Sequence, residues 1–411
     1  PTLTLRAQAA LAAGTGARRA SRMTGWGSGS SIGGRVAMSI DPTVLRQLGE
    51  GRRTVLVTGT NGKTTTTRLI AAALGTRGPV ATNTEGANMA GGVVTALAAA
   101  REAEWAVLEV DELHLPAIAD ALRPEVIVLL NLSRDQLDRV GEIHHLESTL
   151  RTALARHPQA VVVANCDDVL ATSAALESPR VQWVAAGSVW TSDAVSCPRS
   201  GERIVHEPGH WSSTGTALAR PMPHWWLDAE RVHGPDGWSA PLQLALPGTV
   251  NRGNAAHAIS AAAAMGVDAI AATQAMAQVA EVAGRYRTVR IGGHTARILL
   301  AKNPAGWQQA LGMLHPHASG HVIAVNGREA DGRDLSWLWD VPFEQFGSRA
   351  VTACGERRAD LAVRLAYAGV PHACGSDVVE AIRACPSGHV EVMVNYSAFL
   401  HLNRALRRMH A

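Results

Sequence analysis

The sequence lacks long apolar runs, clustered cysteines and a large net charge, and each absence excludes a class of protein. No stretch of 18 or more uncharged apolar residues occurs in the 411 residues, so we expect no transmembrane helix. The five cysteines are odd in number and scattered along the chain, which fits a reducing cytoplasm better than a disulfide framework. A net charge of +3 is too small over this length to indicate a nucleic-acid-binding protein.

The N-terminal segment, residues 1–50, begins with an Ala- and Arg-rich stretch and continues into Gly- and Ser-rich sequence. It has no compact apolar stretch of the kind that marks a secretory signal. The first part is compatible with a short amphipathic helix. Its arginines (Arg6, Arg18, Arg19 and Arg22) form either a solvated helix face, which is the simpler interpretation, or a peripheral contact with a membrane surface.

A glycine-rich loop is the most informative stretch of the chain. Residues 59–66 read G-T-N-G-K-T-T-T and lie between a strand-like segment, 54–57, and a helical run, 67–74. In this arrangement the loop amides approach nucleotide phosphates, the lysine reaches the β- and γ-phosphates, and the threonine hydroxyl binds Mg²⁺. A polar turn is the simpler alternative, but the flanking strand and helix favour phosphate binding. The expected contacts come from Gly59, Thr60, Asn61, Gly62, Lys63, Thr64 and Thr65.

The spacing of this loop is a variant of the Walker pattern. Val57 stands where a Walker loop has its first glycine, and the loop instead begins at Gly59. The loop is therefore tighter than the standard one.

Strands and helices alternate through the central part of the chain, 51–288. Continuous apolar, β-branched segments at 106–110, 126–130 and 160–164 predict a parallel sheet that is covered by helices on both faces. Such sheets bind ligands at the carboxyl ends of their strands. The phosphate loop lies at one of these ends.

Two further regions follow. Residues 181–246 hold six of the eleven tryptophans and lack helical periodicity, so we expect a small β-rich insertion; a helix is predicted at 251–265. Residues 289–411 again alternate, with strands at 322–325, 350–353 and 390–394 and a helix at 358–368. This pattern predicts a second, smaller α/β domain.

Acidic and polar side chains follow two of the predicted central strands. Glu109 ends one strand, and Asp111 and Glu112 come directly after it; Glu109 is either a magnesium ligand or a solvated charge, and the clustering favours metal. Residues 131–139, N-L-S-R-D-Q-L-D-R, follow the next strand. They contact nucleotide, metal and substrate, or cap the following helix, or do both.

Together these features resemble the Mur ligase superfamily and, within it, the MurT family of synthetase subunits. The resemblance covers most of the chain in order. It is carried by the loop, the strand ending in Leu-Glu and the stretches at 82–89, 131–143, 301–306, 331–340 and 394–398. Stand-alone Mur ligases have a His where Gln136 stands, which points toward the MurT family.

The resemblance implies roles for individual residues. Lys63 and Thr64 would bind ATP phosphates and Mg²⁺, with Glu109 helping to hold the metal. Asn251 and Asn254 match asparagines near the nucleotide base, and Arg285 matches an arginine at the domain junction. Lys302 and Asn303 are expected at the active cleft, with helix capping as the simpler role.

The resemblance also implies a partner. Asp334 matches an aspartate thought to complete the Cys-His pair of a GatD-like glutaminase as a catalytic triad; Asp331 and Asp340 are nearby alternatives. None of the cysteines of this chain sits in a convincing nucleophile elbow, although Cys354-Gly355 comes nearest. A separate subunit that supplies ammonia is therefore expected.

The tryptophan-rich insertion departs from the family pattern. Many MurT proteins carry two Cys pairs there as a zinc ribbon, whereas this chain keeps Cys197 and has Ser200 in the second place. A structural zinc site needs four ligands, and His206 and His210 could supplement Cys197 but are more simply surface residues. We expect a degenerate ribbon without zinc, held by tryptophan packing.

The resemblance implies the function, namely ATP-dependent amidation of the D-glutamate α-carboxylate in lipid II with ammonia from the partner, in the cytoplasm or at the inner face of the membrane. A stand-alone amino-acid ligase, or an enzyme like folylpolyglutamate synthase, is the first alternative; Gln136 and the segment 331–337 argue against it. A P-loop ATPase that binds nucleic acid or acts as a switch, without synthetic activity, is the second, and the modest charge and the absence of a basic stripe argue against it.

Overall fold

The computed structural model describes residues 3–23, 31–83, 87–134, 143–187, 190–280 and 286–409. By its internal contacts the chain forms two compact units, one of residues 1–132 and 142–280 and the other of residues 133–141 and 281–411. Several predicted site residues lie outside the described residues, namely Arg285 and the polar run from Asp135 through Gln136 to Arg139.

A nine-stranded sheet forms the centre of the first unit, in the order β11-β10-β9-β6-β5-β4-β1-β3-β2. The strands β9, β6, β5, β4, β1, β3 and β2 pair in parallel with their neighbours in this order. Strand β10 pairs antiparallel with both β9 and β11 and so forms an antiparallel edge. The strands span β1 Arg53–Thr58, β2 Val80–Thr82, β3 Trp105–Glu109, β4 Val126–Leu129, β5 Val161–Asn165, β6 Val181–Ala185, β9 Trp225–Leu227, β10 Arg231–His233 and β11 Ser239–Pro241. The predicted parallel sheet is confirmed.

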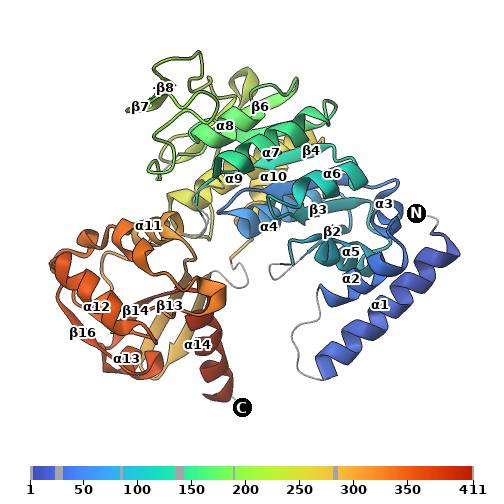
Figure 1. The fold of residues 1–411 in the computed structure, drawn as a ribbon. Coiled ribbons are helices and arrows are strands. Elements are labelled where there is room, and N and C mark those ends of the chain that lie inside the picture. Colours follow the sequence, from blue (N-terminus) through green and yellow to red (C-terminus); the bar gives the residue numbers. More distant parts are fainter. Residues whose placement is uncertain are drawn as a thin grey trace. The chain divides into compact units, whose positions relative to one another are not determined.

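Helices cover both faces of this sheet (Figure 1). One face carries α4, α9 and α10, which contact one another, and the other carries α5 to α8. These helices span α4 Lys63–Leu74, α5 Ala90–Ala99, α6 Leu115–Leu122, α7 Ile143–Ala155, α8 Val169–Ala175, α9 Thr249–Ala264 and α10 Ala269–Ala277.

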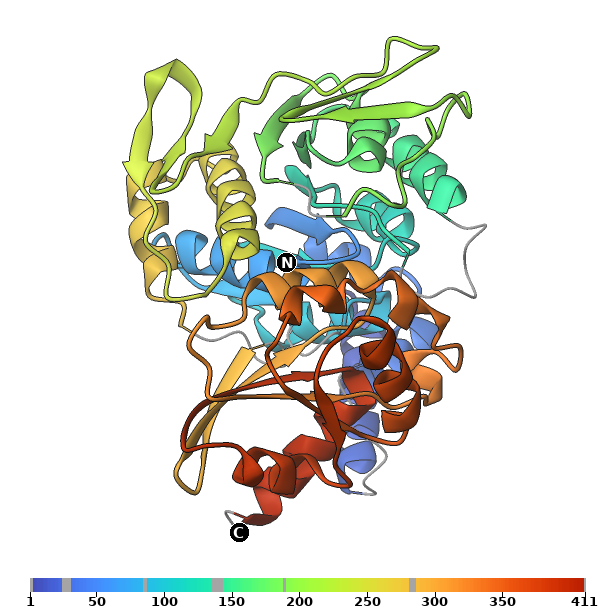
Figure 2. The ribbon, with the colours of Figure 1, turned by 90° about the vertical axis from the view of Figure 1, so that its left-hand side faces the viewer.

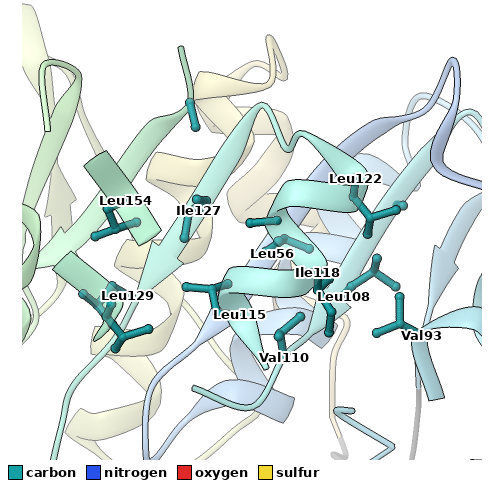
Figure 3. Close-up of a cluster of buried hydrophobic side chains, with 14 of the residues drawn as sticks. Leu56, Val93, Leu108, Val110, Leu115, Ile118, Leu122, Ile127, Leu129 and Leu154 are labelled. Atoms are coloured by element: carbon teal, nitrogen blue, oxygen red, sulfur yellow. The ribbon is translucent and has the colours of Figure 1, made fainter. Parts of the chain in front are cut away.

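The core of the first unit lies between the sheet and α5 to α8. Figure 3 shows Leu115 and Ile118 of α6 pointing toward Leu56 of β1 and Leu108 of β3, and all four side chains are buried. This face of the central strands is therefore apolar, and the polar residues considered below follow the strands at their carboxyl ends.

Three N-terminal helices, α1 Leu5–Met23, α2 Ile32–Ile40 and α3 Val44–Gly49, pack against the outer side of this helical layer. Helix α2 contacts α1 and α5, and α3 contacts α5 and α6. Glycines allow the close approach: a Cβ atom on Gly34 would lie 1.8 Å from the carbonyl oxygen of Gly91 on α5. The N-terminal segment thus belongs to the first compact unit.

The tryptophan-rich region is β-rich, as predicted, but most of its strands extend the main sheet. Strand β6 pairs in parallel with β5 and β9, and Figure 2 shows the β9–β11 strands beside the helices α9 and α10. Only β7 Ile204–Glu207 and β8 His210–Ser213 form a separate two-stranded sheet. A one-turn 3₁₀ helix, η2 Pro235–Gly237, precedes β11.

The second unit contains a six-stranded sheet in the order β12-β13-β17-β14-β15-β16, drawn in orange to red in Figure 2. All neighbours pair in parallel except β12 with β13. The strands span β12 Tyr286–Ile291, β13 His294–Leu300, β14 Gly320–Ala324, β15 Val351–Cys354, β16 His372–Cys374 and β17 Gly388–Val394. The predicted second α/β domain is confirmed.

Apolar side chains among the described residues of this unit include a core on the sheet and an aromatic cluster. Ile382 of α13 and Phe399 of α14 join a core with Val322 and Val392 of the sheet, and Trp307, Trp337 and Phe343 form a separate aromatic cluster. The helices span α11 Pro304–Gly312, α12 Arg358–Tyr367, α13 Val378–Ala384 and α14 Tyr396–Met409, with short 3₁₀ helices η3 Glu329–Asp331, η4 Ser336–Asp340 and η5 Phe343–Phe346.

Within the part of the chain that the structure describes, no helix combines the length and hydrophobicity that a membrane span requires.

The contact between α2 and α5 can be tested by replacing Gly34 with alanine. The added methyl would collide with a backbone oxygen and force the helices apart, so we expect Gly34→Ala to lower the free energy of unfolding by about 1–3 kcal/mol. Gly16→Ala is the matched control, because this exposed helical glycine has nothing within 4 Å of its Cβ position. There we expect a gain of about 0.5–1 kcal/mol. Equal effects in urea denaturation would contradict this account of the packing.

Candidate functional site

The glycine-rich loop joins the end of β1 to the start of α4, which begins at Lys63, earlier than predicted. Gly59 and Gly62 have φ angles of 127° and 87°, a region that side chains disfavour. A Cβ on Gly59 would also lie 2.9 Å from the carbonyl oxygen of Asn131, and one on Gly62 would lie 2.5 Å from Asn254 Oδ1. Both glycines are therefore required by conformation and by space.

Asn131, directly after β4, holds the loop in place. The N–H of Asn61 donates to Asn131 Oδ1 (2.9 Å), and Asn131 Nδ2 donates back to the carbonyl of Asn61 (3.0 Å). The N–H of Thr60 donates to the carbonyl of Asn131 (2.9 Å). The amides of residues 60 and 61 thus already have acceptors, whereas the first N–H groups of α4 have no acceptor within the helix.

Lys63 is buried at the start of α4. Its ammonium group donates to the carbonyl oxygens of Gly59 (2.5 Å) and Thr60 (3.3 Å) and forms an ion pair with Glu112 Oε1 (3.0 Å). From the sequence, Glu112 was only one member of an acidic cluster. The structure identifies it as the carboxylate that contacts the loop lysine.

Thr64, in the first turn of α4, contacts Glu109, the last residue of β3. Strands β1 and β3 pair with Val57 opposite Glu109, and Thr64 Oγ1 donates to Glu109 Oε2 (2.8 Å). A hydroxyl and a carboxylate oxygen are hard ligands of the type that Mg²⁺ prefers, so these two residues fit the predicted metal.

Asn83, which sequence reasoning did not single out, fixes the main chain of Glu109. The N–H of Glu109 donates to Asn83 Oδ1 (2.8 Å), and Asn83 Nδ2 donates to the carbonyls of Glu109 (2.7 Å) and Ala87 (2.8 Å). The available signal was its place directly after a short strand in the stretch 82–89. Thr84, Glu85 and Gly86 of that stretch lie outside the described residues.

The two predicted asparagines lie in the first turns of α9, which packs against α4. Asn251 Nδ2 donates to the carbonyl of Pro247 (2.6 Å), and Asn254 Nδ2 donates to Asn251 Oδ1 (3.3 Å). Because Asn254 also lies against Gly62, the fold brings it to the loop. Both side chains are buried.

Two buried titratable groups of the first unit are His257 in α9 and Asp168 directly before α8. Burial lowers the pKa of His257 on α9 to about 4, and its Nδ1 donates to the carbonyl of Gly253 (3.0 Å). Burial raises the pKa of Asp168 to about 7, although this carboxylate accepts the N–H groups of Ala171 (2.7 Å) and Leu132 (3.3 Å). His257 is therefore neutral near pH 7, and Asp168 fastens the start of α8 to the segment after β4.

The aspartates proposed to serve a partner lie in the second unit and differ in environment. Asp331 is buried and accepts the N–H and hydroxyl of Ser397 at the start of α14. Asp334 and Asp340 are exposed, and hydrogen bonds from the N–H and side chain of Ser336 hold the pKa of Asp334 below its usual value. Asp331 thus has a structural role in this unit, whereas Asp334 is accessible.

Asn303 and Lys302 also lie in the second unit. Asn303 Oδ1 accepts the N–H of Gly306 (2.8 Å) and caps α11. Helix capping, the simpler role expected for this residue, is therefore confirmed. The Lys302 ammonium lies 5.2 Å from the centre of the Tyr396 ring.

The segment around β7 and β8 is held by apolar contacts. Cys197 and Trp211 are buried in one small core with Ile204 and Leu218, and the Trp211 indole N–H donates to the carbonyl of Cys166 (2.9 Å). This confirms the predicted packing for Trp211. Among the described residues, no group of three or more His, Cys, Asp or Glu side chains is placed to hold a metal ion.

Comparisons with known proteins identify the family of this chain. The family described as Mur ligase middle domain matches residues 57–262, and the family described as MurT ligase C-terminal matches residues 300–399. The chain is 30% identical to the lipid II isoglutaminyl synthase (glutamine-hydrolyzing) subunit MurT of Streptococcus pneumoniae, over 92% of this chain and 93% of that protein.

Solved structures of low sequence identity share the fold. A pseudomurein peptide ligase type C from Methanothermus fervidus has a TM-score of 0.68 at 16% identity and covers 89% of this chain and 80% of its own. The MurF ligase of Thermotoga maritima in complex with ADP has a TM-score of 0.61 at 18% identity and covers 90% and 83%.

The geometry of the loop predicts the effect of Gly62→Ala. The new methyl would displace Asn254 in addition to straining the backbone, so we expect ATP affinity to fall by about tenfold or more, a cost of about 1.4 kcal/mol. Gly266→Ala is the matched control, since Gly266 has a φ of 81° but nothing within 4 Å of its Cβ position. It should cost stability through strain alone and leave ATP binding unchanged. Similar ATP affinities for the two variants in calorimetric titration would refute the assignment.

Proposed function

The chain belongs to the MurT family of the Mur ligase superfamily, and from this membership we propose that it is the synthetase subunit of a lipid II isoglutaminyl synthase. The observation that carries the proposal is the similarity to a MurT subunit along nearly the whole chain, with the phosphate loop, Thr64 and Glu109 assembled at one sheet edge. In this proposal the chain activates the D-glutamate α-carboxylate in the stem peptide of lipid II.

The proposed reaction has two steps. The substrate carboxylate attacks the γ-phosphorus of ATP, which forms an acyl phosphate and releases ADP. Ammonia then attacks the acyl carbon, phosphate leaves, and the amide of D-isoglutamine remains after loss of a proton.

The residues of the first unit would act mainly by positioning and charge stabilisation, as is usual in phosphoryl transfer. Lys63 and the N–H groups at the start of α4 would bind the phosphates. Thr64 and Glu109 would hold Mg²⁺, which when bound neutralises phosphate charge. Asn251 and Asn254 would lie toward the nucleotide, as would Arg285.

The ammonia source is proposed to be a GatD-like glutaminase subunit, whose histidine Asp334 would orient. We further propose that the reaction takes place in the cytoplasm, at the inner face of the membrane that carries lipid II. The exposure of Asp334 supports this assignment. Asp331 is less suited to this role, because its carboxylate already accepts a hydrogen bond from Ser397.

One assay separates the proposed activity from its alternatives. The chain is incubated with ATP, lipid II and glutamine, with and without the co-purified glutaminase. We expect amidated lipid II only when the glutaminase is present. Incorporation of a free amino acid would instead indicate a stand-alone ligase, and ATP hydrolysis stimulated by nucleic acid would indicate a P-loop ATPase of another class.

Asp334→Asn should separate ammonia supply from ammonia use. Replacing the orienting carboxylate of a triad costs about 10⁴-fold in rate, so we expect glutamine-dependent amidation to fall by at least about 10³-fold. Amidation from free ammonium salt should continue at the wild-type rate. Asp340→Asn is the matched control, as this residue is also exposed; the reverse pattern would transfer the role to Asp340.

Lys63→Met should abolish amidation from either nitrogen source, because the lysine would stabilise charge on the transferring phosphoryl group. Loss of such a group costs at least about 10²–10³-fold in kcat. Co-purification of the glutaminase should be unaffected. Arg68→Met, which removes an exposed cation from the same helix, should leave both properties unchanged, and loss of the partner with Lys63→Met alone would contradict the proposed division of labour.

A further inference from the structure

The ion pair between Lys63 and Glu112 has no role in the mechanism above. Glu112 follows β3 and precedes α6, and its Oε1 lies 3.0 Å from Lys63 Nζ. Both residues are buried, with exposed fractions of 7% for Lys63 and 9% for Glu112. A buried ion pair of this kind is costly to break on one side, because the remaining charge is left without a partner.

The ammonium group of Lys63 is already hydrogen-bonded in this state. A lysine ammonium has three N–H donors, and the acceptors around Lys63 include the carbonyls of Gly59 and Thr60 and the carboxylate of Glu112. A phosphate oxygen that approaches the ammonium group competes with these acceptors. The two carbonyls belong to the loop itself, whereas the carboxylate belongs to a separate segment and carries a charge like that of phosphate.

We propose that Glu112 is a positioning residue that occupies Lys63 in the nucleotide-free state and is displaced from Nζ by a phosphate oxygen when ATP binds. The proposal rests on the proposed function only in that nucleotide phosphate binds at this loop. Displacement leaves the Glu112 carboxylate beside the phosphates, where like charges repel. The exchange therefore makes ATP affinity depend on a divalent cation.

The test measures ATP binding to the full-length chain by calorimetric titration, once in EDTA and once with Mg²⁺. Glu112→Gln keeps an oxygen that can accept from Lys63 but removes the charge. We expect it to bind metal-free ATP about tenfold more tightly than the wild type, a change of about 1.4 kcal/mol. The gain in affinity from Mg²⁺ should shrink correspondingly.

Asp111→Asn is the matched control. Asp111 is the neighbouring carboxylate, but its Oδ1 accepts the N–H of Leu113 (3.1 Å). The same loss of charge should leave metal-free ATP affinity within about twofold of the wild-type value. The proposed effect comes from the direct contact between Glu112 and Lys63, and long-range repulsion from a neighbouring carboxylate is screened by salt. Equal tightening in both variants would overturn the exchange at Lys63.

Two further outcomes would also overturn the proposal. Unchanged or weaker metal-free binding by a folded Glu112→Gln variant would exclude competition, and weakening seen only with Mg²⁺ would identify Glu112 as a metal ligand instead. Glu112→Asp, which keeps the charge on a shorter side chain, provides a second variant and should tighten metal-free binding by a smaller factor. The assay contains neither lipid II nor glutaminase, so failure of amidation would not affect its result.

Discussion

The parallel pairing of β1 with β3 and β4 is the constraint on which the candidate site depends. Parallel strands end at the same edge of a sheet, so the residues that follow each strand are brought together. Here the three ends supply the loop from Gly59, the carboxylate of Glu109 and the amide of Asn131. A shift of one residue in either pairing would turn the side chains of the shifted strand to the opposite face and break the contact between Thr64 and Glu109.

The polar side chains at this edge of the sheet are of two kinds, neutral asparagines and charged residues. Asn83 and Asn131 bond to the main chain of Glu109 and Asn61, and they position groups without carrying charge themselves. Lys63, Glu109 and Glu112 supply the charges. The asparagines satisfy main-chain groups that would otherwise be buried without partners, whereas the charged side chains contact Thr64 and one another.

The second unit repeats the same principle with different chemistry. Here Asn303, which follows β13, caps α11, and Asp331 of η3 accepts hydrogen bonds from Ser397 at the start of α14. Asp334, a few residues away, is left exposed. Two aspartates of one short segment thus differ in role because one meets a helix start and the other meets solvent.

Much of this organisation was accessible from the sequence. The loop, the apolar strands and the alternation with helices predicted the parallel sheet of the first unit and a second α/β domain, because glycine spacing and continuous β-branched runs are local properties of the chain. The family resemblance pointed to Lys63, Thr64, Glu109 and Asn254 through short motifs in the sequence. The structure places these four around one loop, while Arg285 and Gln136 lie outside the described residues.

Other features were decided only by the tertiary structure. The pairing of Lys63 with Glu112, the support of Glu109 by Asn83 and the merger of β6 and β9 with the main sheet join residues that are distant in the chain or ambiguous in pattern. An acidic cluster in a sequence does not reveal which carboxylate turns inward, since burial and strand register select it. The sequence by itself determined that a glycine-rich loop would join a strand to a helix and that two α/β units would form, because these are local patterns. The packing of strand ends decided which charges face the loop, because it joins segments that are distant in the chain.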